Sequence, residues 1–201
     1  MILYELFRNE DNPVYKELSL SNYSRQLDFL KHLVTIAPKS GNVFLSQTVL
    51  KALNYHAMAC LHDYAGQYRP HMVEIRNRRN IVTYTPPEHF RVNTLMDDFV
   101  NRINRMWEQT EPFELAALVL WKLNWIHPFV NGNGRTARAA CYFVLCLKAG
   151  GWLAGKPILP DRLRRDSRYV PFLIEADNGD IKPLTMLVKD LTYQQLLSAQ
   201  Q

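Results

Sequence analysis

The sequence has few cysteines and no long hydrophobic stretch. Its 201 residues include three cysteines, Cys60, Cys141 and Cys146. An odd number of cysteines in apolar segments is typical of reduced thiols buried in a core, and no zinc-ligand spacing is present. No apolar run approaches the roughly 18 residues of a membrane span, and residues 1–5 do not resemble a signal peptide. We therefore expect a soluble protein of the cytoplasm with no membrane partner; a translocated effector is the alternative left open.

Repeats, low-complexity tracts and flexible linkers are also absent. With 47% hydrophobic and 11% aromatic residues, the chain can bury a sizeable core. We predict one domain over residues 1–201, with a core over about 46–195 and an N-terminal helical extension over 1–45. The net charge of +5 suits an anionic partner, but the basic residues are scattered apart from segments 76–79 and 162–165. A nucleic acid partner is therefore not expected.

Hydrophobic spacing predicts a mostly helical protein. Ser46 is a plausible N-cap for a helix running to about His62. A helix that starts at Pro112 is apolar on more than one face, so it should be the central, buried one. It should end at His127, because Pro128 disfavours helical conformation in the preceding residue. The remaining helices are expected over residues 21–36, 91–107, 135–149, 167–176 and 183–195.

One segment departs from helical spacing. Between Gly66 and Glu88, apolar residues alternate or cluster around a polar turn and then meet two prolines, which predicts a short β-hairpin. No other strand region is expected, so the predicted fold class is an all-α helical bundle with a β-hairpin. The hairpin's apolar and aromatic residues are Val73, Ile75, Ile81, Val82 and Tyr84.

The loop between the two most apolar helices carries the groups of a phosphate site. Gly132 and Gly134 let the backbone approach a ligand closely, and the free N–H groups of the following helix favour an anion. Arg135 and Arg138 are three residues apart, so both guanidiniums can reach the same phosphate chain. His127 can accept a proton near neutral pH. Each of these residues alone is more often structural, but together they indicate a phosphate site with an adjacent base.

This loop, His-Pro-Phe-Val-Asn-Gly-Asn-Gly-Arg-Thr-Ala-Arg over residues 127–138, resembles the signature of the Fic (Fido) family in every fixed position but one. The family signature is His-Pro-Phe-x-(Asp/Glu)-Gly-Asn-Gly-Arg-x-x-Arg. Segments 66–69, 73–75, 84–87 and 167–180 also resemble parts of that family. The resemblance implies a Fic-type helical bundle with a β-hairpin flap. It further implies the transfer of AMP from ATP to a Ser, Thr or Tyr hydroxyl of a target protein.

The resemblance also implies roles for single residues. His127 is expected to deprotonate the target hydroxyl, Phe129 to pack below the loop, and Tyr169 to lie near the adenosine. The hairpin is expected to align the target by strand addition. The related Doc kinases carry lysine at the position of Gly134, and glycine favours attack at the α-phosphate. The phosphates of ATP are expected to be bound by Gly132, Asn133, Gly134, Arg135 and Arg138.

The single departure from the signature is Asn131, where the family has an acid that binds Mg²⁺. An amide oxygen can bind a hard cation, but it brings no negative charge and holds magnesium more weakly. Three explanations remain open: a working transferase with weaker metal dependence, a silenced module that binds nucleotide or protein, or a sequence altered at this position. We favour the working transferase because His127 and both arginines are present. Transfer of UMP and removal of AMP are further alternatives.

A regulatory motif of the family is missing. Many members carry an inhibitory helix with the pattern Ser/Thr-x-x-x-Glu-(Gly/Asn), and no glutamate of this sequence is followed by glycine or asparagine. The sequence leaves open a separate antitoxin chain or other regulatory partner, a helix elsewhere in a larger protein, a diverged motif, or no such control.

Overall fold

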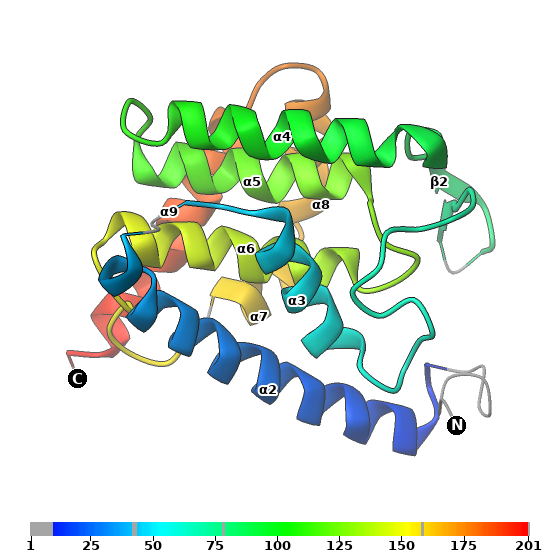
Figure 1. Ribbon diagram of the computed structural model, residues 1–201, viewed down its shortest axis with the longest axis horizontal. Helices are drawn as coiled ribbons and strands as arrows, with labels where there is room; N and C mark the ends of the chain where they lie inside the picture. Colours follow the sequence, from blue (N-terminus) through cyan, green and yellow to red (C-terminus); the bar gives the residue numbers. More distant parts are fainter. Residues whose placement is uncertain (1–9, 42–43, 78, 158, 201) are drawn as a thin grey trace.

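The computed structural model describes residues 10–41, 44–77, 79–157 and 159–200. Within these ranges the chain forms eight α-helices and one pair of short strands, which confirms the predicted all-α bundle with a hairpin (Figure 1). None of the helices in the described ranges is long and apolar enough to cross a membrane. The helices are α2 (Pro13–Ile36), α3 (Gln47–Met58), α4 (Val92–Met106), α5 (Pro112–Ile126), α6 (Asn133–Lys148), α7 (Leu159–Arg165), α8 (Tyr169–Asp177) and α9 (Lys182–Ser198).

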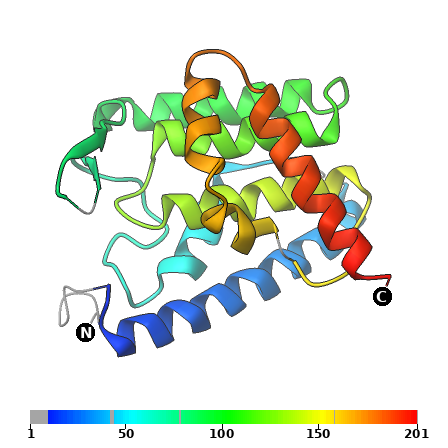
Figure 2. The same ribbon diagram turned by 180° about the vertical axis from the view of Figure 1, so that it is seen from behind.

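The helices stack in layers around α6. In Figure 1, α4 and α5 lie along one side of α6, and α3 and α2 lie along the other. Seen from behind, α8 and α9 cover the remaining face, with α9 crossing beside α5 (Figure 2). The two helices on either side of the 127–132 loop, α5 and α6, share the most extensive interface of the fold. The loop between them is therefore anchored at both ends by the core.

The most deeply buried helix is α6, and the prediction that this role falls to α5 is wrong. Every residue from 139 to 147 in α6 is buried, whereas α5 leaves Trp121, Lys122 and Trp125 partly exposed. The ammonium of Lys122 lies 3.6 Å from the Trp125 ring centroid and 4.8 Å from that of Trp121. A cation over these rings stabilises them at the surface. Hydrophobicity on several faces of α5 therefore does not mean burial of all of them.

The first two helices differ from their predicted bounds at one end each. Helix α2 begins at Pro13, well before the predicted start at residue 21. Asn12 caps the helix by accepting the Val14 N–H at 2.9 Å, and a proline is favourable in the first turn. Ser46 caps α3 as predicted, accepting the Val49 N–H at 3.1 Å. Helix α3 ends at Met58, before residue 62, since Cys60 has a φ of +62°. Cys60 is exposed, so its prediction as a core thiol is wrong; Cys141 and Cys146 are buried.

Two later elements were misjudged from the sequence. Helix α6 begins at Asn133, so the signature residues from Asn133 onward belong to its first turns. Helix α7 was not expected, because its seven residues are too few to show a helical period. Its side chains matter to the site described below.

The predicted hairpin consists of β1 (Ile75–Arg76) and β2 (Val82–Tyr84), paired antiparallel as Ile75 with Tyr84 and Arg76 with Val82. Thr83 is the extra residue in this irregular register, and its hydroxyl donates to the Ile75 carbonyl at 3.1 Å. The predicted hairpin residues Val73 and Ile81 lie just outside the paired strands. The hairpin extends from one end of the helical stack (Figure 1).

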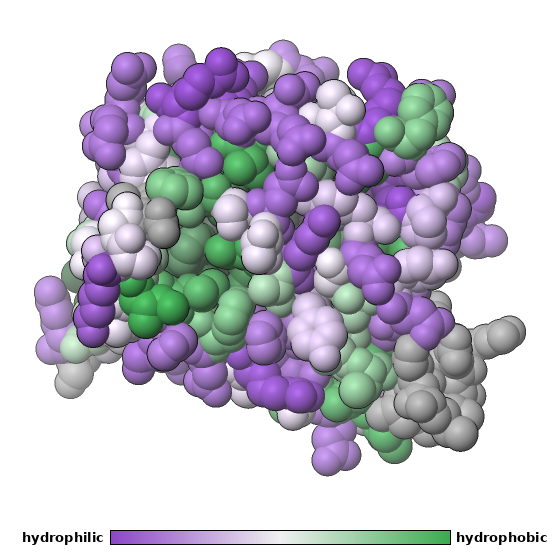
Figure 3. Space-filling view, in the orientation of Figure 1, coloured by the Kyte–Doolittle hydropathy of each residue, from purple (hydrophilic) through white to green (hydrophobic). Residues whose placement is uncertain are grey.

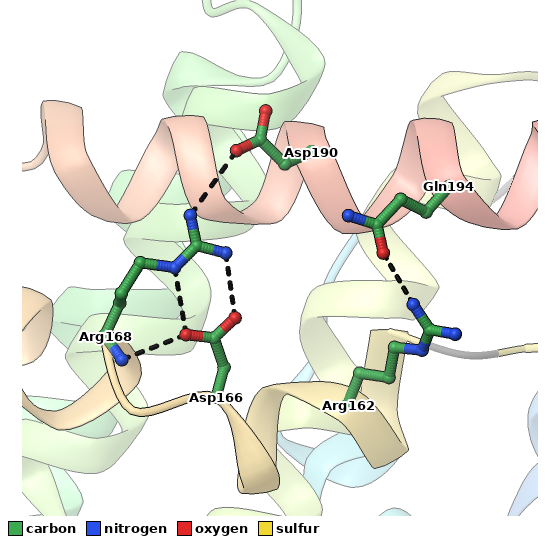
Figure 4. Close-up of polar contacts among 5 residues, drawn as sticks. All are labelled: Arg162, Asp166, Arg168, Asp190 and Gln194. Atoms are coloured by element: carbon green, nitrogen blue, oxygen red, sulfur yellow. Dashed lines mark hydrogen bonds and ion pairs between the residues drawn. The ribbon is translucent and has the colours of Figure 1, made fainter.

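Polar side chains fasten α7 and the turn after it to α9 (Figure 4). The Arg168 guanidinium donates to both carboxylate oxygens of Asp166, at 3.0 and 2.8 Å, and lies 3.7 Å from Asp190 of α9. These hydrogen bonds lower the pKa of Asp166. One turn away, Arg162 donates to Gln194 at 2.6 Å. The short helix α7 is thereby fixed against a long one.

The face of the molecule in Figure 3 is mostly hydrophilic. Hydrophobic residues gather on it beside the C-terminal part of α2 and the segment that leads into α3, where Ile36 and Phe44 are exposed. This gathering lies at the opposite end of α2 from the site described below (Figure 1).

Truncating the core should destabilise the fold far more than truncating its surface. Leu120 of α5 is fully buried, so we predict that Leu120→Ala lowers the free energy of unfolding by about 2–5 kcal/mol. The matched control is Leu197→Ala on α9, whose side chain is exposed; it should change stability by less than about 0.5 kcal/mol. Urea denaturation followed by circular dichroism measures both. Equal losses would show that the packing described here is wrong.

Candidate functional site

His127 ends helix α5 in a strained backbone conformation. Its φ and ψ of 51° and 56° are left-handed, a region that costs a non-glycine residue roughly 1–2 kcal/mol. The N–H of His127 still donates to the Leu123 carbonyl at 3.0 Å, so the helix turns sharply at this residue. The sharp turn directs the chain into the loop 127–132, and the imidazole lines the cavity described below.

The buried side chain of Arg69 holds this conformation in place. Its Nε donates to the His127 carbonyl at 2.9 Å, its Nη1 donates to the His71 carbonyl at 3.4 Å, and its Nη2 donates to the Pro87 carbonyl. The backbone N–H of Arg69 also donates to the Pro128 carbonyl at 2.9 Å. Burial lowers the pKa of the guanidinium. Arg69 thus links the loop that bears His127 to both ends of the hairpin segment.

The surroundings of His127 fix which nitrogen can act as a base. Its Nδ1 lies 3.3 Å from the carbonyl oxygen of Asn124, which can only accept, so Nδ1 carries the proton and Nε2 has the free lone pair. The pKa of His127 is lowered to about 4, mainly by burial and to a smaller extent by the nearby charge of Arg69, against the raising effect of the Asn124 hydrogen bond. His127 is therefore neutral at physiological pH and can accept a proton at Nε2.

Two buried asparagine side chains shape the loop that follows. Asn133 accepts the Phe129 N–H at 2.9 Å and donates to the Phe129 carbonyl at 2.8 Å, which closes the loop on itself. Asn54 of α3 donates to the Asn131 carbonyl at 3.0 Å and to the Thr136 hydroxyl at 3.1 Å. Phe129 is buried, as predicted. The Asn133 side chain therefore builds the loop, and only its backbone remains to meet an anion.

Close approach of neighbouring atoms requires glycine at residue 132 and favours it at residue 134. Gly132 has a φ of +78°, and a Cβ there would lie 2.6 Å from Cγ of Met58. At Gly134, in the first turn of α6, a Cβ would lie 3.0 Å from the Arg138 guanidinium. A side chain at residue 132 would therefore meet α3, and one at residue 134 would crowd Arg138.

An open cavity of about 720 Å³ lies at the N-terminus of α6. This volume is within the range of roughly 300–1,000 Å³ that small-molecule sites occupy. His127, Asn131, Gly132, Asn133, Gly134, Arg135 and Arg138, all predicted site residues, line it together. The other walls come from residues 10–23, at the start of α2, and from residues 160–165 of α7.

The charge of this cavity is predominantly positive. Lys16 pairs with Asp11 at 3.0 Å, and Arg165 pairs with Asp161 at 3.4 Å. Among the described residues, Arg135, Arg138 and Arg164 have no ion pair with a carboxylate. Burial lowers the pKa of Arg138, and its positively charged neighbours contribute to that shift. Glu10 is the one described carboxylate of the lining outside these ion pairs, so the three arginines leave a net positive charge that favours a polyanionic ligand.

Helix α2 contributes to this cavity in a way that the sequence did not reveal. Arg135 donates to the Ser19 hydroxyl at 3.1 Å and to the Ala57 carbonyl at 3.2 Å, and it also hydrogen-bonds with the buried Tyr15. The Arg138 Nε donates to the Pro160 carbonyl of α7 at 2.8 Å. Both signature arginines are thus positioned by elements outside the signature. These contacts join residues far apart in the chain, so local patterns carry no signal of them.

The side chain of Asn131 faces the segment before α2. Its Oδ1 accepts the Gly132 N–H at 2.6 Å, and its Nδ2 donates to Oε1 of Glu10 at 2.9 Å. Glu10 also accepts the Tyr15 hydroxyl at 3.3 Å. An amide oxygen and a carboxylate, both hard donors, therefore lie at the same edge of the cavity.

Some predicted site residues lie away from the cavity. Tyr169 is buried behind it, where its hydroxyl accepts from Asn124 at 3.0 Å and contacts Arg138. The five predicted hairpin residues do not line the cavity either. Tyr84 instead donates to the Trp125 carbonyl at 2.6 Å, which ties β2 to the end of α5. The contacts of Tyr169 and Tyr84 position the site and do not form its surface.

Comparison with known proteins identifies the family. The profile of the Fic/DOC family matches residues 44–145, about half of the chain, and the protein belongs to that family. It is 34% identical over 122 residues to the protein adenylyltransferase Fic of Drosophila willistoni and 35% identical over 122 residues to that of Drosophila melanogaster. These matches cover 60% of this chain but only 23% and 24% of those relatives. The chain thus matches about a quarter of their length.

Solved structures show the same fold. A Fic domain containing signaling protein from Bacteroides thetaiotaomicron has a TM-score of 0.76 and 20% identity, covering 98% of this chain and 76% of that one. Fic-1 from C. elegans has a TM-score of 0.74 and 22% identity, covering 98% of this chain and 55% of that one. Because 98% of the chain is covered in both comparisons, the shared fold includes α2 and α9 as well as the signature.

A side chain at residue 132 should displace the loop. Gly132→Ala places a Cβ against buried Met58 in addition to the strain of a positive φ, so we expect stability to fall by roughly 2–4 kcal/mol. Gly179→Ala is the matched control, with a φ of +96° and no heavy atom within 4 Å of the new Cβ; it should cost only about 1 kcal/mol. Thermal unfolding of the two variants tests this. Similar losses would mean that the loop is not packed against α3.

Proposed function

We propose that this protein transfers AMP from ATP to a hydroxyl side chain of a target protein. The observation that carries the proposal is that the free Nε2 of His127 shares one cavity with the N-terminus of α6 and two arginines of that helix. The names of the relatives, protein adenylyltransferase Fic, support it. So does the likeness to the BepC protein of Bartonella tribocorum, solved with bound AMPPNP, at a TM-score of 0.53 and 16% identity.

In the proposed reaction, His127 acts as the general base. Nε2 removes the proton of the target hydroxyl as its oxygen attacks the α-phosphorus of ATP. A new O–P bond forms, the bond between the α-phosphorus and the bridging oxygen breaks, and pyrophosphate leaves. The protonated imidazole keeps its Nδ1–H bond to the Asn124 carbonyl, which supports this role in both protonation states.

The start of α6 stabilises the phosphates in this proposal. The N–H groups of its first turn and the helix dipole favour an anion, and Gly132, Asn133 and Gly134 line the cavity beside them. Arg135 and Arg138 neutralise the charge that develops on the leaving pyrophosphate. The small Gly134 leaves the Arg138 guanidinium room for a phosphate oxygen.

We also propose Mg²⁺ as the cation of the ATP complex. The described residues include no group of three or more His, Cys, Asp or Glu side chains that could hold a metal, so phosphate oxygens would supply most of the ligands. The residues at the cavity edge fit such an ion, because the Asn131 amide oxygen and the Glu10 carboxylate are hard donors next to the phosphate site. When bound, Mg²⁺ would neutralise charge on the phosphates of ATP.

The hairpin is the proposed docking element for the target. It presents short strands with Ile81 and Val82 exposed, and Tyr84 and Arg69 hold it to the ends of α5 and of the loop. An extended target segment that pairs with a strand edge would be recognised mainly through its main chain. The target's Ser, Thr or Tyr would then enter the cavity beside His127. Tyr169, which lies behind Arg138, is proposed to act through that arginine and not on the adenosine.

The chain acts as one domain in this proposal, with α2 as a part of the site. Residues Tyr15 and Ser19 of α2 contact Arg135, and α2 packs on α3 and α6. A Fic core that begins at about residue 46 would lack one wall of the cavity.

The activity is tested with labelled ATP, and with labelled UTP for the alternative of UMP transfer. We expect label from ATP to appear on hydroxyl residues of protein substrates, located by mass spectrometry. His127→Ala and His127→Asn should lower the rate by about 10²–10⁴-fold while ATP binding persists. The asparagine variant is included because Asn tolerates a left-handed backbone. His32→Ala, at an exposed position on α2, is the control and should retain full activity.

Other outcomes of this assay identify other functions. Label from UTP alone would indicate UMP transfer, and loss of AMP from a modified protein would indicate the reverse reaction. Binding of ATP without transfer to any protein would indicate a silenced module. Undiminished transfer by both His127 variants would exclude His127 as the base.

The dependence of the rate on pH reports the state of His127. Because its pKa is lowered to about 4, the base stays neutral as the pH falls from 7 to 5.5 and is lost only near pH 4. We therefore predict that kcat/KM, which reports the free enzyme, has no acid limb near pH 6.5. The limb of kcat should lie at higher pH, since bound phosphates favour the imidazolium. The affinity of the His127→Ala variant for ATP, measured over the same pH range, corrects for ionisation of the nucleotide. An acid limb of kcat/KM near pH 6.5 would contradict the prediction.

A further inference from the structure

Glu10 and Asn131 are 121 residues apart in the sequence, yet their side chains touch at the edge of the cavity. Asn131 stands at the one position where this loop departs from the family signature, and Glu10 brings a carboxylate to that place from the segment before α2. The carboxylate oxygen accepts from the Asn131 amide at 2.9 Å. A negative charge is thus present beside residue 131, although residue 131 itself carries none.

The position of Glu10 is fixed by the start of helix α2. Its Oε1 also accepts the hydroxyl of Tyr15, a residue that is 97% buried and therefore rigidly placed. Asn12 caps the helix between the two, and Asp11 is engaged with Lys16 at 3.0 Å. Neighbouring contacts therefore direct Glu10, and not Asp11, toward Asn131.

Among residues 10–41, 44–77, 79–157 and 159–200, no cation forms an ion pair with Glu10. Its hydrogen-bond partners Asn131 and Tyr15 are neutral. The arginines of the cavity are instead proposed to bind the phosphates. A carboxylate that faces a triphosphate across a few ångströms is repelled unless a cation lies between them. Glu10 must therefore either oppose the nucleotide or share a cation with it.

We propose that Glu10 supplies the carboxylate ligand of the divalent cation, in place of the acid that the signature lacks at Asn131. The Asn131 amide oxygen is the second protein ligand, and the nucleotide phosphates are the others. This inference rests on the proposed nucleotide site. A cation shared by Glu10 and the phosphates is favoured over repulsion between them, because Mg²⁺ in proteins is usually bound by one or two carboxylates together with phosphate oxygens of the substrate.

Titration of the full-length chain with ATP tests this proposal through binding, independently of activity. ATP affinity is measured by calorimetry in Mg²⁺ and in EDTA, and the affinity of the ATP complex for Mn²⁺ is measured by electron paramagnetic resonance. We expect Glu10→Gln to weaken Mn²⁺ binding about tenfold or more and to remove the gain in ATP affinity that Mg²⁺ gives. Glu17→Gln, the same change at an exposed α2 position outside the cavity, should leave both unchanged.

A double variant separates a metal ligand from a merely structural residue. Glu10→Gln with Asn131→Asp moves the carboxylate from residue 10 to residue 131, and it should restore Mn²⁺ affinity to within a few-fold of the unaltered chain. Circular dichroism confirms folding of each variant.

The opposite results overturn the proposal. Tighter ATP binding by Glu10→Gln in both Mg²⁺ and EDTA would show that Glu10 opposes the phosphates, and unchanged Mn²⁺ affinity would show that it has no role in metal binding. In both cases the nucleotide site itself stands, because ATP still binds. Absence of ATP binding to the unaltered chain in either buffer would instead reject the proposed function, and this inference with it.

Discussion

The site depends on the buried guanidinium of Arg69. It has no carboxylate partner among the described residues, and carbonyls of His127, His71 and Pro87 share its donors. These contacts hold His127 in a left-handed conformation that the chain would otherwise avoid, and they join the loop to the hairpin segment. The same charge helps to keep the imidazole neutral. A single cation thus holds the backbone of His127, contributes to its neutral state and joins it to the hairpin segment.

The structure divides the signature into residues that meet the cavity and residues that build the loop. Phe129 and the side chain of Asn133 are internal, and they close the turn by hydrogen bonds to one another. His127, the two glycines and the two arginines line the cavity. Asn54, which lies outside the signature, joins both parts through the Asn131 carbonyl and Thr136. The proposed phosphate site is therefore built by α3 and α6 together.

Local patterns in the sequence were enough to predict the helices on either side of the loop, the Ser46 cap and the hairpin, because each depends on neighbours along the chain. The motif likewise predicted which residues converge at the N-terminus of α6. Contacts between distant segments were not predictable. Tyr15 and Ser19 reach Arg135 across more than a hundred residues, and α7 is too short to show a period. Tyr169 was expected at the nucleotide and lies behind Arg138, since burial cannot be read from a motif.

The burial of α6 has a consequence for how the cavity adapts to a ligand. Residues 139–147 are enclosed on all sides, so the helix that carries both arginines cannot shift without disrupting the core. That wall is preorganised, and its dipole and guanidiniums meet an incoming charge with little rearrangement. The start of α2 and the short helix α7 lie nearer the surface and have fewer buried residues. The cavity therefore meets a ligand with one wall set by the core and with two walls set by surface contacts of α2 and α7.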